Sequence, residues 1–410
     1  NHDKFNWNFE MEAEEGMAGR RIPCPRGRAL GGSSSINGML YVRGAPADFD
    51  GWAQMGCRGW SYDDVLPYFM KSEDYVQGGD PEVRGQGGPL KVEDYRTILP
   101  LTHRFVEAAQ QAGFPFNPDL NGSTRHGVGY SQMTRRGRFR GSTAQTYLRE
   151  AQREPGGRPN LRVETNAQAG KLLFEGKRCV GATFQRGGKL HEVRANREVI
   201  VSGGAINSPH ILQISGIGPA AHLQSLGIPV THDLPGVGAN LIDHYVVRVV
   251  HRVHDAETVN EISRFPRVLP EILRFFFTGK GALTFGVTTS QVFCDSREGL
   301  ASPDLSWVAV EVIGIGISKD ADLVIAQARQ VGALGHRPER GEVQLGVEVP
   351  GVREDGPVVH RLEVLAPVAH HVDQADQAEG LQLLDAGAHV GARDAEQVLV
   401  QERTVEAVDH

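Results

Sequence analysis

The stretch that decides the fold is Gly27–Tyr41, with the sequence GRALGGSSSINGMLY. Its adjacent glycines, Gly31 and Gly32, allow the backbone to approach another molecule closely, because neither carries a Cβ atom. The serines that follow add hydroxyl and amide donors of the kind that bind phosphate oxygens, and Asn37-Gly38 predicts a second tight turn. On residue chemistry alone the stretch fits a nucleotide-binding loop or an ordinary Gly/Ser loop, and the ordinary loop is the commoner of the two.

A second glycine segment lies further along the chain. Arg197–Ser202 (REVIVS) is predicted to form a buried strand that Gly203 and Gly204 end. A helix is predicted over Ser208–Ile214, with Pro209 in its first turn. A strand followed by a glycine turn and a helix N-terminus can hold phosphate or the edge of a nucleotide. The same order of elements also occurs as a plain connection, so both interpretations stay open.

These segments resemble, in the same order, the two sequence signatures of the glucose–methanol–choline (GMC) oxidoreductase family. The first is Gly27–Tyr41 and the second is Gly204–Pro219 (GAINSPHILQISGIGP). Three supporting stretches are similar to other parts of that family: Arg140–Leu148 (RGSTAQTYL), Arg158–Gly170 (RPNLRVETNAQAG) and Leu234–His244 (LPGVGANLIDH). The resemblance covers about residues 1–306.

The resemblance implies FAD as the cofactor, with the Gly-Gly-Ser part beside the pyrophosphate and the Asn-Gly-Met part beside the isoalloxazine ring. Family members that tether FAD covalently carry His where this chain has Ile36, so the resemblance implies non-covalent FAD. At Ala169, where family members usually have Val, a backbone contact would hold the adenine. The implied cofactor-binding residues are Gly31, Gly32, Ser33, Asn37, Gly38, Met39, Leu40, Ala169, Gly203 and Gly204.

The implied fold class is α/β (α+β overall): a partial FAD-binding doubly wound nucleotide domain with a partial antiparallel-sheet substrate domain. Five segments are predicted. They are an FAD-binding part with the first signature (1–45), a flavin-covering or intervening segment (46–155), an FAD-binding part with the second signature (156–245), the start of the substrate domain (246–306) and an aberrant tail (307–410). The implied reaction is choline dehydrogenase-like, oxidising a CH–OH group of a small-molecule alcohol by hydride transfer to flavin N5.

Two departures from the family pattern lead to a second hypothesis. The chain begins after the family's GxGxxG unit, and no stretch after Ser306 resembles the region that carries the catalytic His, so catalytic residues stay unassigned. Trp307 is the last of 28 aromatic residues, and no Ile, Lys, Ser or Asn follows position 330. We interpret this tail as out-of-frame translation in preference to an acidic disordered tail.

The alternative function is therefore a truncated or frameshifted, non-catalytic fragment, and we expect this particular chain to be inactive. The histidines of the tail are given no role: His336, His360, His370, His371, His389 and His410.

Other features limit the partners. His210 and His244 are predicted to be hydrogen-bonded core residues. Nothing resembles a basic nucleic-acid patch, the four cysteines have no metal or redox spacing, and no run of about 18 apolar residues predicts a transmembrane segment. A cytoplasmic protein is expected, with peripheral membrane association left open. The sequence predicts no oligomeric state.

Overall fold

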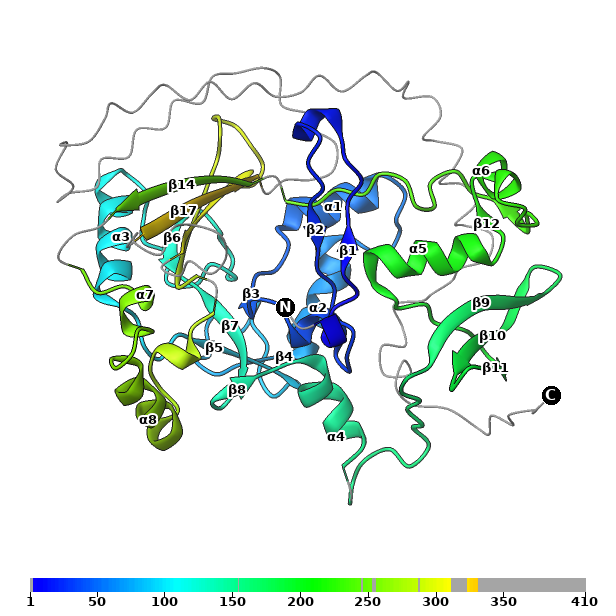
Figure 1. The fold of residues 1–410 in the computed structure, drawn as a ribbon. Coiled ribbons are helices and arrows are strands. Elements are labelled where there is room, and N and C mark those ends of the chain that lie inside the picture. Colours follow the sequence, from blue (N-terminus) through cyan, green and yellow to red (C-terminus); the bar gives the residue numbers. More distant parts are fainter. Residues whose placement is uncertain are drawn as a thin grey trace. The chain divides into compact units, whose positions relative to one another are not determined.

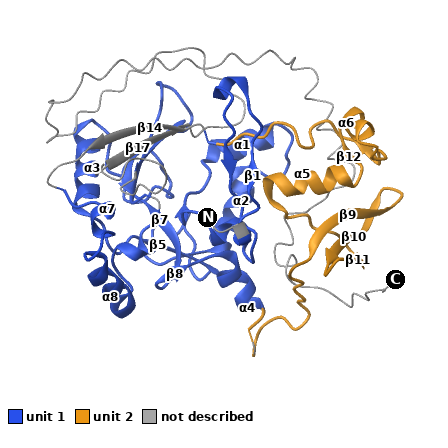
Figure 2. Cartoon of the chain, in the orientation of Figure 1, with its two compact units in different colours: residues 1–151, 244–370 blue, residues 152–243, 371–410 orange. Residues whose placement is uncertain are grey.

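The computed structural model describes residues 3–153, 155–244, 246–252, 256–286, 288–310 and 323–330. The described chain divides into two compact units, each treated by itself below (Figure 2). The first combines residues 1–151 with the segment from His244 onward, and the second comprises residues 152–243, both within the described ranges. Residues 311–322 and 331–410 lie outside the described part, so most of the predicted aberrant tail and its six histidines lie there too.

The first unit contains an antiparallel sheet of five strands in the order β14-β17-β16-β15-β6 (Figure 1). The strands are β6 (Gly127–Tyr130), β14 (Val246–Arg252), β15 (Ser290–Cys294), β16 (Leu305–Val310) and β17 (Leu323–Gln330). Helix α3 (Pro100–Gln111) packs on this sheet through a core of Val106, Ala109, Val128 and Val292. The apolar residues of α3 recur at helical spacing, so they share the face of the helix that contacts this core.

A second sheet of the same unit has the order β3-β7-β5-β4, and β8 pairs with β7. Its strands are β3 (Leu40–Tyr41), β4 (Glu73–Tyr75), β5 (Leu90–Asp94), β7 (Gln132–Arg136) and β8 (Phe139–Arg140). The ladder of β4 with β5 is parallel, and those of β7 with β3, β5 and β8 are antiparallel. Since β3 directly follows the glycine loop, this sheet holds one end of that loop.

Besides α3, the described part of the first unit contains further helices. They are α1 (Pro46–Gln54), α2 (Tyr62–Ser72), α4 (Arg149–Ala151), α7 (Val259–Ile262) and α8 (Val268–Thr278), beside a π-helical turn over Ala144–Leu148. Ser61 caps α2: its hydroxyl oxygen accepts the amide of Asp64, and the Asp64 carboxylate accepts the amide of Ser61. A two-strand ribbon, β1 (Phe9–Glu10) with β2 (Pro23–Cys24), leads into the glycine loop.

The second unit is built on an antiparallel meander of β9 (Gln168–Glu175), β10 (Arg178–Arg186) and β11 (Lys189–Arg194). The turn between β10 and β11 is Gly187-Gly188, and both glycines have positive φ, as a two-residue hairpin requires. Helix α5 (Gly204–Ile214) is tied to β9, because the amide of Leu172 donates to Ser215 Oγ at 2.8 Å. A short parallel pair, β12 (Ile217–Gly218) with β13 (His232–Asp233), flanks α6 (Ala220–Ser225).

The structure overturns three predictions in the second unit. Arg197–Ser202 is not a buried strand: it forms no ladder among the described residues, and Ile200 is 53% exposed. Apolar runs predict burial only where another element covers them. Pro209 is the sixth residue of α5 and not in its first turn, since the helix begins earlier than the apolar pattern indicated. His210 is exposed on α5 and is not a core residue.

Candidate functional site

The Gly27–Tyr41 loop of the first unit turns sharply at its two glycines. Gly31 and Gly32 have φ angles of 85° and 52°, a region that L side chains rarely adopt, and a short 3-10 helix, Gly32–Ser35, follows. A Cβ on Gly31 would lie 2.7 Å from Ser35 Oγ and 3.1 Å from the amide nitrogen of Ala144. A Cβ on Gly32 would meet no atom of the described residues within 4 Å. Gly31 therefore packs against protein, whereas Gly32 borders open space, and the neighbouring Ser33 is exposed.

The far end of the loop is held in a strained conformation. Met39 has a φ of 64°, and its amide donates to Asn37 Oδ1 at 3.1 Å. The Met39 carbonyl accepts from the amide of Thr134 at 2.8 Å, just before Leu40 enters β3. Gly286 also approaches closely, because a Cβ there would lie 2.7 Å from the Gly38 carbonyl oxygen. These contacts hold the backbone of Asn37–Leu40 in one conformation, and we call this segment the loop edge.

The segment Arg140–Leu148 backs the loop from the other side. The guanidinium of Arg140 donates through Nη1 to the Asn37 carbonyl at 2.6 Å and to Asn37 Oδ1 at 2.7 Å. The amide of Thr143 donates to Ser34 Oγ at 3.0 Å, and that hydroxyl donates to the Gly31 carbonyl at 2.5 Å. The sequence placed both segments in one family pattern but showed no reason for them to touch. The structure joins them across more than one hundred residues.

Arg140 is a partly buried cation in this arrangement. Burial lowers the pKa of its guanidinium, and within the described chain it has hydrogen bonds to loop oxygens and no ion pair with a carboxylate. A desolvated positive charge beside exposed backbone can attract an anionic or electron-rich group. This residue is a functional candidate that reasoning from the sequence missed.

Behind β3 lies a second feature that the sequence did not reveal, a buried network of charges. Glu73 is fully buried and accepts from Arg43 Nη2 at 2.5 Å and from Arg84 Nη2 at 2.7 Å. Arg84 also pairs with Asp119 at 2.5 Å and lies 3.8 Å from the ring centre of Tyr75. Two arginines and two carboxylates therefore balance in charge, as burial demands. The network connects β4 to the chain that leaves the glycine loop.

Tyr75 and Asp94 form the rim of this network. Tyr75 donates from its hydroxyl to Asp94 Oδ1 at 3.1 Å. Burial raises the pKa of Asp94 most strongly; the bond from Tyr75 opposes this, Asp119 adds to the rise, and Arg84 opposes it. Burial likewise raises the pKa of Tyr75, and the charges of Asp94 and Asp119 add to it.

Asp94→Asn is expected to flatten the pH dependence of stability. Because the pKa of Asp94 is raised on folding, the folded state binds the proton more tightly than the unfolded state. Stability should fall as the pH rises from the ordinary pKa of 3.8 through the higher folded pKa. The asparagine side chain would keep an acceptor for Tyr75 and could not ionise, so the variant should gain melting temperature above that window and match the parent below it. Equal pH profiles for the two proteins would contradict this prediction.

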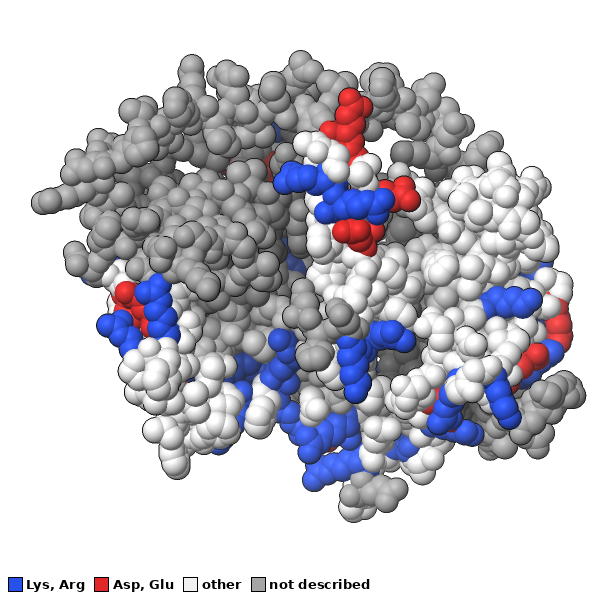
Figure 3. Space-filling view, in the orientation of Figure 1, with Lys and Arg blue, Asp and Glu red and all other residues white. Residues whose placement is uncertain are grey.

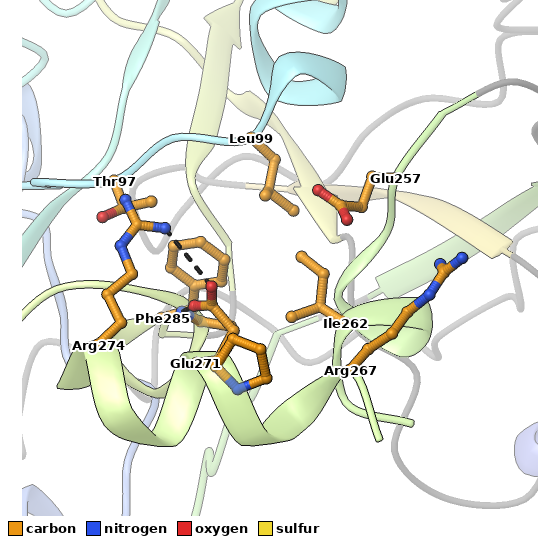
Figure 4. Close-up of a pocket in the computed structure, with 10 residues that line it drawn as sticks. Thr97, Leu99, Glu257, Ile262, Arg267, Glu271, Arg274 and Phe285 are labelled. Carbon is orange, nitrogen blue, oxygen red and sulfur yellow. Dashed lines mark hydrogen bonds and ion pairs between the residues drawn. The ribbon is translucent and has the colours of Figure 1, made fainter. Parts of the chain in front are cut away.

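A cavity of about 330 Å³ lies beside α8 in the first unit (Figure 4). Leu99, Ile262 and Phe285 provide apolar walls. Two carboxylates and two guanidiniums also line it: Glu257, Glu271, Arg267 and Arg274. Glu271 accepts the amide of Ala282 at 2.6 Å and pairs with Arg274 at 3.5 Å, so its charge is already compensated. The cavity can admit a small molecule, but its balanced charges favour neither a cation nor an anion.

The remaining predicted residues lie in the second unit. Ala169 is on β9, and Gly203 and Gly204 stand at the start of α5, which packs against that strand. Gly204 has a φ of 85°, and within the part of the chain that the structure describes a Cβ there would have no neighbouring atom closer than 4 Å. The structure thus gathers Gly31–Leu40 in one unit and these three residues in the other. His244, where the chain returns to the first unit, was predicted as a core residue and is exposed.

Comparisons with known proteins agree with this fold. The model of the family described as GMC oxidoreductase matches residues 14–246. An oxygen-dependent choline dehydrogenase of Sinorhizobium medicae is 49% identical over 308 residues, covering 74% of this chain and 54% of that protein. The enzyme of the same name from Brucella suis is 42% identical, covering 75% and 55%. An FAD-dependent oxidoreductase from Chaetomium thermophilum superposes with a TM-score of 0.71 at 22% identity, covering 80% and 65%.

The fold is that of the FAD-dependent oxidoreductases, with mixed helices and sheets. The chain belongs to the GMC oxidoreductase family, and the resemblance found in the sequence is confirmed. FAD is the cofactor of this class. The chain spans about half the length of the curated relatives it matches.

Proposed function

We propose that this chain belongs to an FAD-dependent oxidoreductase that oxidises the CH–OH group of a small-molecule alcohol. The observation that carries the proposal is the geometry of Gly31–Leu40. Hydrogen bonds from Arg140 and Thr143 hold this backbone, and the space beside Gly32 is open among the described residues. Exposed Ser33 and Asn37 supply polar groups there, which fits a cofactor that presents both phosphate oxygens and a polar ring edge. When bound, FAD would accept the hydride from the alcohol.

The residues that we propose to hold FAD are the ten implied by the family resemblance. Gly31, Gly32 and Ser33 would face the pyrophosphate, and Asn37, Gly38, Met39 and Leu40 would face the ring. Ala169, Gly203 and Gly204 would serve the adenine and the nucleotide edge. No covalent link is proposed, because Ile36 carries no atom that could form one. No described residue is assigned as the proton acceptor.

Choline is the substrate that the named relatives suggest. The cavity beside α8 has a size suited to such a molecule, but its two carboxylates are matched by two guanidiniums. The proposal of choline therefore depends on the relatives, and the proposal of an alcohol is the broader one. We place the enzyme in the cytoplasm; no helix among the described residues is long and apolar enough to cross a membrane.

A matched pair of glycine variants tests where FAD lies. Gly31→Ala should lower the free energy of unfolding by about 1–3 kcal/mol, because its Cβ would collide with Ser35 and Ala144 at a strained φ. Gly32→Ala should cost only about 1 kcal/mol, the penalty of the left-handed backbone, yet it should weaken FAD binding about tenfold or more. Denaturant unfolding and flavin titration measure the two effects. Unchanged FAD affinity in Gly32→Ala would show that FAD does not occupy the space beside Gly32.

The activity of the chain itself is tested by its visible spectrum. The purified chain should take up FAD and show the flavin absorption band. Our expectation from the sequence is that this chain does not turn over, so adding choline without oxygen should leave the band intact. Bleaching by choline or another alcohol would show that the non-catalytic alternative is wrong. Failure to bind FAD at all would contradict the cofactor site.

A further inference from the structure

Helix α8 has apolar residues on both sides. Val268, Ile272 and Phe275 are partly buried against the unit. A different side of the helix carries a stripe at positions 269, 273, 276 and 277, which recur at helical spacing. Its members are exposed instead of packed: Leu269 by 46%, Leu273 by 58%, Phe276 by 63% and Phe277 by 81%.

An aromatic residue from a distant part of the chain extends this stripe. Phe139 is 66% exposed, and its ring lies edge-on to that of Phe275 with centroids 6.5 Å apart. We call these five exposed side chains the α8 face: Phe139, Leu269, Leu273, Phe276 and Phe277. A contiguous apolar surface of this kind on a water-exposed helix indicates an interaction site, because leaving it in water is unfavourable.

Cationic side chains border the α8 face. Lys280 follows the helix, and Arg138 donates to the carbonyl oxygen of Phe276 at 2.5 Å, whereas Arg267, just before the helix, lines the cavity together with Glu271. All three are exposed, and Figure 3 shows Lys and Arg surface beside the uncharged lobe at the position of α8, with a smaller area of Asp and Glu at its upper edge. On α8 itself the acidic residue is Glu271, which faces the cavity and pairs with Arg274. Figure 4 shows the Glu271 carboxylate turned toward the cavity and paired with Arg274.

We propose that the α8 face docks on an anionic membrane surface. Phenylalanine and leucine side chains would enter the boundary between headgroups and acyl chains, while the flanking cations would bind anionic headgroups. A second copy of the chain fits this surface less well. A two-fold interface would bring the same cations of both copies together, and like charges across an interface disfavour binding.

Vesicle sedimentation of the whole chain tests this proposal. The chain should pellet with phosphatidylcholine vesicles that contain phosphatidylglycerol, and less with phosphatidylcholine alone. Binding should weaken severalfold near 1 M salt, where the screening length is about 3 Å. Replacing both Phe276 and Phe277 with serine should reduce the partition coefficient about tenfold or more, since each phenylalanine loses its apolar burial.

The matched control is Leu190→Ser, which removes a side chain that is 70% exposed on β11. Its vesicle binding should equal that of the parent, and circular dichroism should show all variants folded. Absence of binding to the anionic vesicles, equal binding to neutral ones, or full binding by the double variant would each overturn the proposal. So would a stable dimer that the double variant loses, because the α8 face would then join two copies of the chain.

Discussion

Glu73→Gln is expected to lower the free energy of unfolding of the first unit by about 3–5 kcal/mol, the usual cost of removing one partner from a buried ion pair. The Glu73 carboxylate is fully buried and accepts from Arg43, from Arg84 and from the amide of Gly85 at 2.8 Å. The amide of glutamine would have one acceptor oxygen and no charge. Two guanidiniums would then stay buried with Asp119 as the remaining carboxylate beside Arg84.

Tryptophan fluorescence in denaturant measures this effect, because all four tryptophans, at positions 7, 52, 60 and 307, lie in the first unit. Glu150→Gln is the control. Glu150 pairs with Arg136 at 2.6 Å, but both side chains are more than 40% exposed, so the change should be about 0–1 kcal/mol. A loss in Glu73→Gln no larger than in the control would show that the network contributes little to stability.

The contrast between this network and α2 shows which features a single sequence could predict. The helix over Ser61–Ser72 and the β10–β11 hairpin follow from signals a few residues apart: a cap, an apolar period, a pair of glycines. Glu73, Arg84 and Asp119 carry no such period. They contact one another only because β4, the turn after it and a distant loop fold together. Neither the composition nor the spacing of these residues in the sequence predicts those contacts.

The same reasoning explains the errors. Arg197–Ser202 has the continuous apolar run of a buried strand, yet no other described strand pairs with it, and β-structure requires such a partner. His210 and His244 were predicted to be buried because they stand in apolar or structured contexts, and both are exposed. The glycine loop was recognised because long motifs carry family information. Its fixation by Arg140 required the three-dimensional arrangement.

Arg140→Met is the variant with the largest expected effect on cofactor binding. Arg140 Nη1 holds the Asn37 carbonyl and Asn37 Oδ1, the same oxygen that accepts the amide of Met39. Methionine keeps much of the apolar stem of arginine and cannot donate these bonds. Met39 has a positive φ that only its surroundings maintain, so the Asn37–Met39 edge should relax into other conformations.

A cofactor that needs this edge in one conformation would then bind only the fraction of molecules that retain it. Both bonds start from one nitrogen of Arg140, so we expect a loss equal to about one hydrogen bond from a charged donor, about 1.5–3 kcal/mol, and FAD affinity should fall by about tenfold to a hundredfold. Hydrogen exchange should rise at residues 34–39 in the same variant before any FAD is added, and Arg140→Lys should recover part of the affinity.

Arg178→Met, which removes a single bond from an exposed guanidinium to the Asn196 carbonyl, is the control and should bind FAD as the parent does. If Arg140→Met exchanges faster at residues 34–39 but binds FAD normally, the loop is flexible in the variant without being the flavin site, and the assignment of Asn37–Leu40 to the ring falls.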